Sequence, residues 1–165
     1  MSLPHKIYVD GGVIGRNPSA LGGTWAWVWV DKKDRELRHD SGIITPKEAK
    51  LDKITNNYTE LYAALEGLAS VMPYWDGIIY TDSLITLRRI TYSMSFKNIP
   101  NSLKEKALEL RRDREWDCIL VKGHPTKKDL LRGTCPKGTL VSRWNVFCDR
   151  KCKHLAREFK ENLED

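Results

Sequence analysis

Four acidic residues stand where strand-like segments end or helix-like segments begin: Asp10, Glu60, Asp82 and Asp149. Asp10 and Asp82 each follow a short apolar run typical of a buried strand. Glu60 opens one amphipathic helical segment, and Asp149 falls in the first turn of another. Carboxylates that converge in a fold repel one another, so they stay ionised only when cations neutralise them. The pattern predicts a site for divalent metal.

The charge balance fits an anionic partner. The chain of 165 residues carries a formal net charge of +6, and residues 122 to 153 hold nine Lys or Arg against two acids. Basicity alone is as typical of a solvated surface as of nucleic-acid binding. A basic stretch combined with an acid cluster favours metal-dependent phosphodiester chemistry.

The length of the chain predicts one domain, 1–165, with a core of ordinary size. The sequence has no apolar run long enough for a membrane span, and residues 1–5 lack the apolar stretch of a signal peptide. We therefore expect a cytoplasmic monomer with no membrane partner, in which the four cysteines are reduced thiols.

Hydropathy periods and turn residues predict three strands, a helix, a strand, two helices, a strand and a last helix. Turns are expected at 11–12 and 15–18, and a polar connection over 45–54. The three tryptophans within 24–30 share one face and are expected in the core. The order predicts an α/β fold, in which three antiparallel and then parallel strands form a five-stranded mixed sheet with helices on both faces. The strands are expected over 6–10, 24–30, 36–44, 77–82 and 116–122, and the helices over 57–72, 83–92, 102–114 and 145–163.

Five blocks of sequence resemble the motifs of type 1 ribonuclease H, in the order of that family, and together they span residues 7 to 156. The blocks are Ile7-Tyr8-Val9-Asp10-Gly11-Gly12 with Asn17-Pro18, Thr55-Asn56-Asn57-Tyr58-Thr59-Glu60-Leu61, Tyr80-Thr81-Asp82-Ser83, Val121-Lys122-Gly123-His124, and Asn145-Val146-Phe147-Cys148-Asp149. The resemblance implies the ribonuclease H-like fold. It also implies an endonuclease that hydrolyses the RNA strand of RNA–DNA hybrids by a two-metal mechanism.

The resemblance gives each acid a role. Asp10 would bridge two Mg²⁺ ions, Glu60 and Asp82 would hold one of them, and Asp149 would hold the other, with Mn²⁺ as an alternative ion. His124, on a loop after a glycine, would assist proton transfer or product release. Asp129 is the rival for the fourth acid, but no predicted helix fixes it, so Asp149 is preferred.

Substrate contacts are implied by the same motifs. Gly11, Gly12, Asn17, Asn56 and Asn57 would read the 2′-hydroxyls and base edges that distinguish a hybrid from DNA. Thr55 would seat a phosphate of the DNA strand. An Asn pair before a helix is also ordinary capping chemistry, and that interpretation remains open.

The chain departs from the family pattern in three places. Leu84 stands where a polar, groove-reading residue is common, and the stretch from Asp82 to Lys122 is short for the basic protrusion of some members. In its place a longer basic insertion, expected as a loop or irregular hairpin over about 125–144, would grip the hybrid's phosphates and become ordered on binding. Its cations are Lys127, Lys128, Arg132, Lys137 and Arg143.

Three alternatives remain. A zinc site could use Cys135, Cys148, Cys152 and His154, although small buried thiols explain the two helix cysteines more simply. A DNA-junction resolvase would keep the fold and the metals, but the Thr-Asn-Asn run and the position of Asp149 argue against it. A non-catalytic basic nucleic-acid-binding module would not need four acids beside a phosphate.

Overall fold

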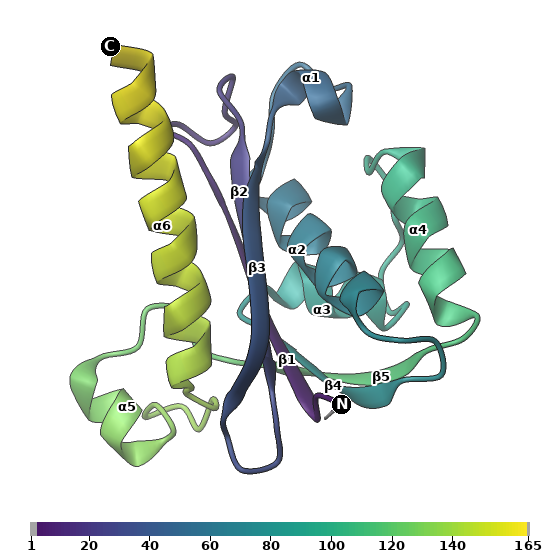
Figure 1. Cartoon of the computed structure of the whole chain (residues 1–165), viewed down its shortest axis with the longest axis vertical. Coiled ribbons are helices and arrows are strands. Elements are labelled where there is room, and N and C mark those ends of the chain that lie inside the picture. Colours follow the sequence, from purple (N-terminus) through teal and green to yellow (C-terminus); the bar gives the residue numbers. More distant parts are fainter. Residues whose placement is uncertain (1–2, 165) are drawn as a thin grey trace.

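A computed structural model describes residues 3–164 and consists of one mixed sheet between two helical layers (Figure 1). The sheet has the order β3-β2-β1-β4-β5, in which β1–β2 and β2–β3 pair antiparallel and β1–β4 and β4–β5 pair parallel. This arrangement confirms the predicted fold class. The strands are β1 Lys6–Val13, β2 Gly23–Val30, β3 Glu36–Ile44, β4 Asp76–Thr81 and β5 Glu115–Leu120.

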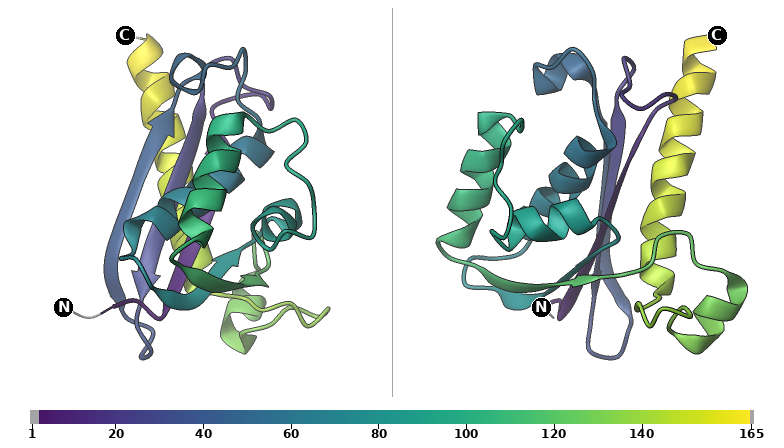
Figure 2. Two further views of the ribbon diagram at one scale, coloured as in Figure 1. Left: turned by 90° about the vertical axis from the view of Figure 1, so that its right-hand side faces the viewer. Right: turned by 180° about the vertical axis from the view of Figure 1, so that it is seen from behind.

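Helices cover both faces of the sheet, as Figures 1 and 2 show. On one face lie α2 (Asn56–Ser70), α3 (Leu84–Ile90) and α4 (Asn101–Arg111), and on the other lies α6 (Arg143–Glu164). Two short helices, α1 (Pro46–Ala49) and α5 (Lys127–Arg132), lie at the margins. Among the residues described, no helix combines the length and the apolar character that crossing a membrane requires.

The alternation of β2 divides the core into two parts. Trp27 and Trp29 are buried on the side of α2, and Trp25 packs partly buried against the same cluster. Val28 and Val30 point to the other face, where they meet Cys148 and Cys152 of α6 and other buried residues. Because successive side chains of a strand alternate between faces, this one segment contributes to both apolar layers. The prediction that the tryptophans belong to the core is confirmed.

Strand β1 is longer than predicted. It continues through Gly11 and Gly12 to Val13 instead of turning, because it pairs with β2 as far as Val13 opposite Gly23.

Two helix starts also differ from the prediction. Pro100, not Ser102, precedes α4, and it provides no side-chain cap. Since α6 already begins at Arg143, Asp149 lies in its second turn and not in its first.

The two short helices were not predicted, yet each has a capping box. In α1 the Thr45 side chain accepts a hydrogen bond from the backbone amide of Glu48. In α5 the Thr126 side chain accepts one from the backbone amide of Asp129. The insertion at 125–144 is therefore partly helical. Leu140 also forms isolated bridges with Val121 and Thr134, which tie the segment to the end of β5.

Candidate metal centre

Three of the four predicted acids converge at the carboxyl end of the central strands. Asp10 lies on β1, Asp82 directly follows the parallel strand β4, and Glu60 lies on the helix α2 that packs against β1. One carboxylate oxygen from each residue lies within 4.8 Å of the other two. Adjacent parallel strands bring their carboxyl ends to one sheet edge, which explains how residues distant in the sequence meet there.

The approach of α2 to β1 depends on Gly11. A Cβ atom at this position would lie 2.5 Å from the carbonyl carbon of Thr59 and 2.6 Å from the backbone nitrogen of Glu60. The backbones of the strand and the helix are therefore in direct contact next to Asp10. This contact holds Asp10 and Glu60 at the short separation that the cluster requires.

Burial leaves this cluster electrostatically unbalanced. Asp10 and Glu60 are 3% and 6% exposed, and burial is the first cause that raises the pKa of each, followed by the charges of neighbouring acids. The Gly11 amide donates to Asp10 Oδ1 at 3.0 Å, whereas Glu60 Oε2 is buried without a hydrogen-bond partner. Across residues 3–164, no Lys or Arg forms an ion pair with Asp10, Glu60 or Asp82.

Asp82 has polar support that the sequence analysis missed. Burial raises its pKa, and a hydrogen bond from the Asn145 amide opposes that rise. Asn145 is buried, and its Nδ2 also donates to the carbonyl oxygen of Lys122 at 3.3 Å. Its position, one helical turn before Asp149, is the sequence signal that could have found it.

The fourth acid, Asp149, lies beside the other three but outside the group of mutually close oxygens. All four line one hollow of about 230 Å³, which we call the acid cleft, together with His124 and others. Lys153, which was not predicted, is 3.0 Å from Asp149 Oδ2, and His124 Nδ1 is 3.9 Å from the same oxygen. The His124 side chain is 74% exposed and its backbone is left-handed, with φ of 52°.

The predicted substrate-binding residues divide into two groups. Gly11, Gly12 and Asn56 line the acid cleft. Thr55 is the N-cap of α2, where its Oγ1 accepts from the Tyr58 amide at 3.1 Å, so the cap is Thr55 and not the Asn pair. Asn17 Oδ1 accepts from the Asn56 amide at 3.1 Å, and Asn57 is exposed in the first turn of the helix.

The basic insertion lies outside the acid cleft. Lys127, Lys128 and Arg132 are exposed on α5. Asp129, the rival for the fourth acid, is on a helix after all, but its carboxylate accepts from the Thr126 amide at 3.0 Å as part of the capping box. Leu84 is 44% exposed at the start of α3.

The helix cysteines are buried thiols, as expected. Cys148 Sγ and Cys152 Sγ donate to the carbonyl oxygens of Tyr8 and Asp10, each at 3.6 Å. Burial raises the pKa of both thiols, so they remain protonated at neutral pH. These hydrogen bonds tie α6 to β1 beside the acid cleft.

No protein-family model matches the sequence, and no curated protein matches it. Solved structures do match. The N-terminal RNase H domain of Rv2228c from Mycobacterium tuberculosis, determined as a fusion with maltose-binding protein, has a TM-score of 0.67 at 16% identity, over 98% of this chain and 99% of that one. RNase H1 from Halobacterium salinarum has a TM-score of 0.54 at 21% identity, over 71% of this chain and 84% of that one.

A third structure, LC11-RNase H1 in complex with an RNA/DNA hybrid, has a TM-score of 0.50 at 22% identity, over 70% of this chain and 84% of that one. The similarity to the Mycobacterium tuberculosis domain extends over nearly the whole of both chains. Together with the strand order and the helices on both faces, these similarities show that the chain has the ribonuclease H-like fold.

Proposed function

We propose that this chain hydrolyses the RNA strand of RNA–DNA hybrids with divalent metal as its cofactor. The observation that carries the proposal is the convergence of Asp10, Glu60 and Asp82, of which two are almost fully buried and none forms an ion pair with a Lys or Arg among the described residues. One of the similar folds, LC11-RNase H1, was determined in complex with an RNA/DNA hybrid, which supports the choice of substrate.

The donor set fits magnesium. It offers only carboxylate oxygens, the ligands that Mg²⁺ prefers, and Glu60 Oε2 has no other partner. Burial, followed by the charges of neighbouring acids, raises the pKa of Asp10 and of Glu60, so a cation bound between them would favour their ionised forms. Asp10, Glu60 and Asp82 would hold the metal, and the adjoining Asp149 would complete the set.

A divalent ion held there would activate the attacking water and stabilise the leaving 3′ oxygen. The protein residues supply position and proton transfer. Asn145 orients Asp82, and Lys153 holds the carboxylate of Asp149 at the edge of the cleft. The exposed imidazole of His124, beside Asp149, is placed to move a proton between the reacting phosphate and water.

Recognition of the RNA strand is assigned to the edge of the same cleft. The polar side chain of Asn56 and the backbone of Gly11 and Gly12 line it next to the acids. A 2′-hydroxyl both donates and accepts hydrogen bonds, so amide and carbonyl groups that line the cleft with the acids would distinguish RNA from DNA.

The test compares cleavage of a hybrid, duplex RNA, duplex DNA and a DNA four-way junction, with and without Mg²⁺. We expect metal-dependent cutting of the RNA strand in the hybrid alone. Asp10→Asn should nearly abolish cleavage and leave hybrid binding intact, whereas Asp117→Asn, which changes an exposed acid on β5, should cleave normally. Binding without cleavage by the unaltered chain would make it a non-catalytic module, and cutting of the junction alone would make it a resolvase.

A further inference from the structure

A second hollow lies on another side of α6, between that helix and α5. Its volume is about 570 Å³, and residues of the insertion and of the first three turns of α6 line it. We call it the basic groove, and its lining includes Leu130, Arg143, Trp144, Phe147, Arg150 and Lys151. Apolar and aromatic surface thus alternates with cations, and none of the lining residues is acidic.

Aromatic rings and cations are paired within the groove. The rings of Trp144 and Phe147 contact edge to face, with centroids 5.9 Å apart. The Arg143 guanidinium lies 4.7 Å from the centroid of the Trp144 ring, and Lys151 Nζ lies 5.6 Å from that of Phe147. Surfaces that bind single-stranded nucleic acid combine rings that stack on bases with cations that contact the backbone.

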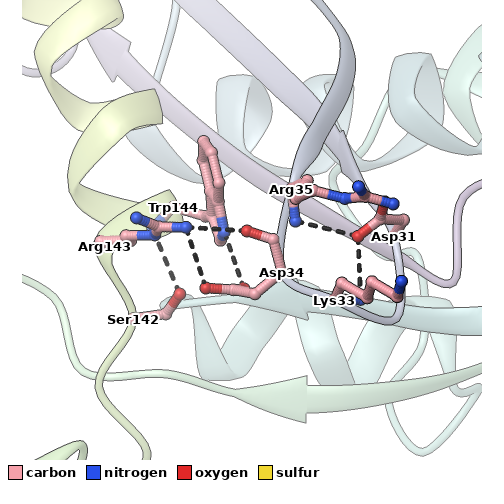
Figure 3. A network of polar contacts seen from close by, with 7 residues as sticks. All are labelled: Asp31, Lys33, Asp34, Arg35, Ser142, Arg143 and Trp144. Carbon is pink, nitrogen blue, oxygen red and sulfur yellow. Dashed lines mark hydrogen bonds and ion pairs between the residues drawn. The ribbon is translucent and has the colours of Figure 1, made fainter.

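One end of the groove is fixed in place by the turn between β2 and β3, as Figure 3 shows. Trp144 Nε1 donates to Asp34 Oδ1 at 2.9 Å, and Arg143 Nη2 donates to the Asp34 carbonyl oxygen at 2.8 Å. The turn itself is stabilised by Asp31, which accepts from the amides of Lys33 and Arg35. The orientation of Trp144 is therefore set before any ligand binds.

Two cations of the groove are available to an anion. Arg143 is paired with Asp34, but Arg150 and Lys151 form no ion pair with any acid among residues 3–164. Leu130 of α5 forms part of the opposite wall and is 39% exposed. The charge of the groove is complementary to a polyanion that also has flat apolar groups.

A third hollow has lining residues in common with both the groove and the acid cleft. It is lined by His124, Pro125, Asn145, Val146 and Asp149, and its volume is about 230 Å³. It shares His124 and Asp149 with the acid cleft and Val146 with the basic groove. A nucleic-acid strand that left the acid cleft past His124 and Asp149 would therefore reach the groove at Val146.

From these shared lining residues and from the charge of the groove, we propose that the basic groove binds a single-stranded nucleic-acid segment continuing from the strand that occupies the acid cleft. The favoured substrate would then be a hybrid that carries a single-stranded tail. The proposed binding site depends only on the residues of the groove, whereas the preference for tailed hybrids rests on the proposed function.

The first experiment measures binding alone, in EDTA, so that it does not depend on cleavage. A fluorescently labelled single-stranded oligonucleotide is titrated with the unaltered chain and with the double variant Arg150→Ala, Lys151→Ala. The matched control, Arg157→Ala with Lys160→Ala, removes two exposed cations of the same helix outside the groove. We expect the groove variant to bind more weakly and to lower the logarithmic salt slope by roughly 0.7 for each phosphate that it no longer neutralises.

A second variant tests stacking. Phe147→Leu keeps an apolar side chain in the groove but removes the ring, and it should weaken oligonucleotide binding about tenfold, with circular dichroism confirming that the helix content is unchanged. Equal weakening of binding in the groove variant and its control would overturn the proposal. Full competition by polyglutamate at the same charge concentration would overturn it too, because the groove would then bind acidic chains in general.

Cleavage distinguishes this proposal from the proposed function. The assay measures cleavage, in Mg²⁺, of a blunt hybrid and of hybrids with a 5′ or a 3′ single-stranded RNA tail. We expect the unaltered chain to have a lower KM for one of the tailed hybrids than for the blunt hybrid. The double variant Arg150→Ala, Lys151→Ala should lose this difference in KM. Oligonucleotide binding at the groove without any cleavage would reject the proposed function and retain the site. Cleavage with equal KM values for all three hybrids would reject the proposed role of the groove in substrate binding and would leave the proposed nuclease function intact.

Discussion

Lys153 Nζ lies 3.0 Å from Asp149 Oδ2, one helical turn away on α6 and at the edge of the acid cleft. Asp10, Glu60 and Asp82 have no such partner among the described residues. Among the residues described, the cleft thus contains one acid that is paired with a lysine and three that have no Lys or Arg partner. A cation binding at Asp149 has to compete with Lys153.

We expect Lys153→Met to lower the Mg²⁺ concentration that gives half-maximal cleavage, by about two- to fivefold, because the competing ammonium is removed. The modest size follows from the exposure of Lys153, whose side chain is 59% exposed, since exposed ion pairs contribute at most about 1 kcal/mol. Lys160→Met is the control on the same helix. An unchanged or higher Mg²⁺ requirement in Lys153→Met would show that the pair does not compete with the metal.

His124 should contribute to the rate without being essential. Its left-handed backbone suits Asn better than Ala, so His124→Asn removes the imidazole with less strain. We expect roughly 10²- to 10⁴-fold slower single-turnover cleavage for His124→Asn, with the Mg²⁺ dependence unchanged. His5→Asn, which alters a histidine outside both the acid cleft and the basic groove, is the comparison. Activity abolished as completely as in Asp10→Asn would instead assign His124 a structural or ligand role.

Replacement by alanine should affect stability differently at two glycines near the acids, Gly11 and Gly123. At Gly11 the nearest neighbour of the new Cβ would be a backbone atom at 2.5 Å, whereas at Gly123 the nearest neighbours would be atoms of the Asp82 side chain, with Oδ2 at 3.0 Å. Gly11→Ala should destabilise the fold by about 2–4 kcal/mol in urea titration. Gly123→Ala should unfold like the unaltered chain but cleave more slowly at saturating Mg²⁺. Equal unfolding midpoints for the two variants would contradict the asymmetry.

The sheet and the long helices could be predicted because their sequence periods are strong. The alternation of residues 24–30 and the apolar stripe of residues 57–72 each correspond to an observed element, and five strands in the predicted order follow. The continuation of β1 through Gly11 and Gly12 was missed because two adjacent glycines resemble a turn. The reason for a glycine at position 11 is the close contact between β1 and α2, which leaves no room for a side chain. That contact cannot be recognised in the sequence.

The same difference between local sequence patterns and tertiary contacts applies to the short helices and to the residues that support the acids. The patterns Thr45-Pro46-Lys47-Glu48 and Thr126-Lys127-Lys128-Asp129 are capping boxes that local rules could have identified. Asp10, Glu60 and Asp82 were predicted from the expected ends and starts of their elements and from the resemblance, although Asp10 lies within β1 and not at its end. Asn145 was quoted in the fifth block but given no role, and Lys153 was not singled out, although both lie one helical turn from Asp149 and so share its side of α6.

The stability of the metal-free chain should fall as pH rises. Burial and neighbouring acids raise the pKa of Asp10 and Glu60 in the folded state, so the folded chain binds more protons than the unfolded chain between the ordinary and the raised values. The free energy of unfolding therefore decreases as pH rises through that interval and levels off above it. Below about pH 4, where both states are protonated, this effect disappears.

Asp10→Asn should remove much of that pH dependence. In EDTA near neutral pH we expect it to be more stable than the unaltered chain by on the order of 1–3 kcal/mol, while Asp117→Asn changes little. Added Mg²⁺ should raise the Tm of the unaltered chain more than that of Asp10→Asn, because the ion binds the ionised carboxylates. A less stable Asp10→Asn, or equal Tm shifts on adding Mg²⁺, would contradict this account of the cluster.

The exposed cations of α5 should contribute to hybrid affinity by neutralising phosphates. Lys127, Lys128 and Arg132 all lie on one short helix beside the beginning of α6, outside the acid cleft. Replacing the three with Ala should weaken hybrid binding and lower the logarithmic salt slope by about 0.9 for each phosphate left without its cation, because fewer counterions are released. The rate of cleavage at saturating hybrid should stay the same, since none of the three reaches the carboxylates. The control replaces Lys32, Lys33 and Lys104, which are exposed on the β2–β3 turn and on α4. If both triple variants changed the salt slope equally, α5 would be an ordinary solvated surface, and the grip on the hybrid would have to be sought on other elements.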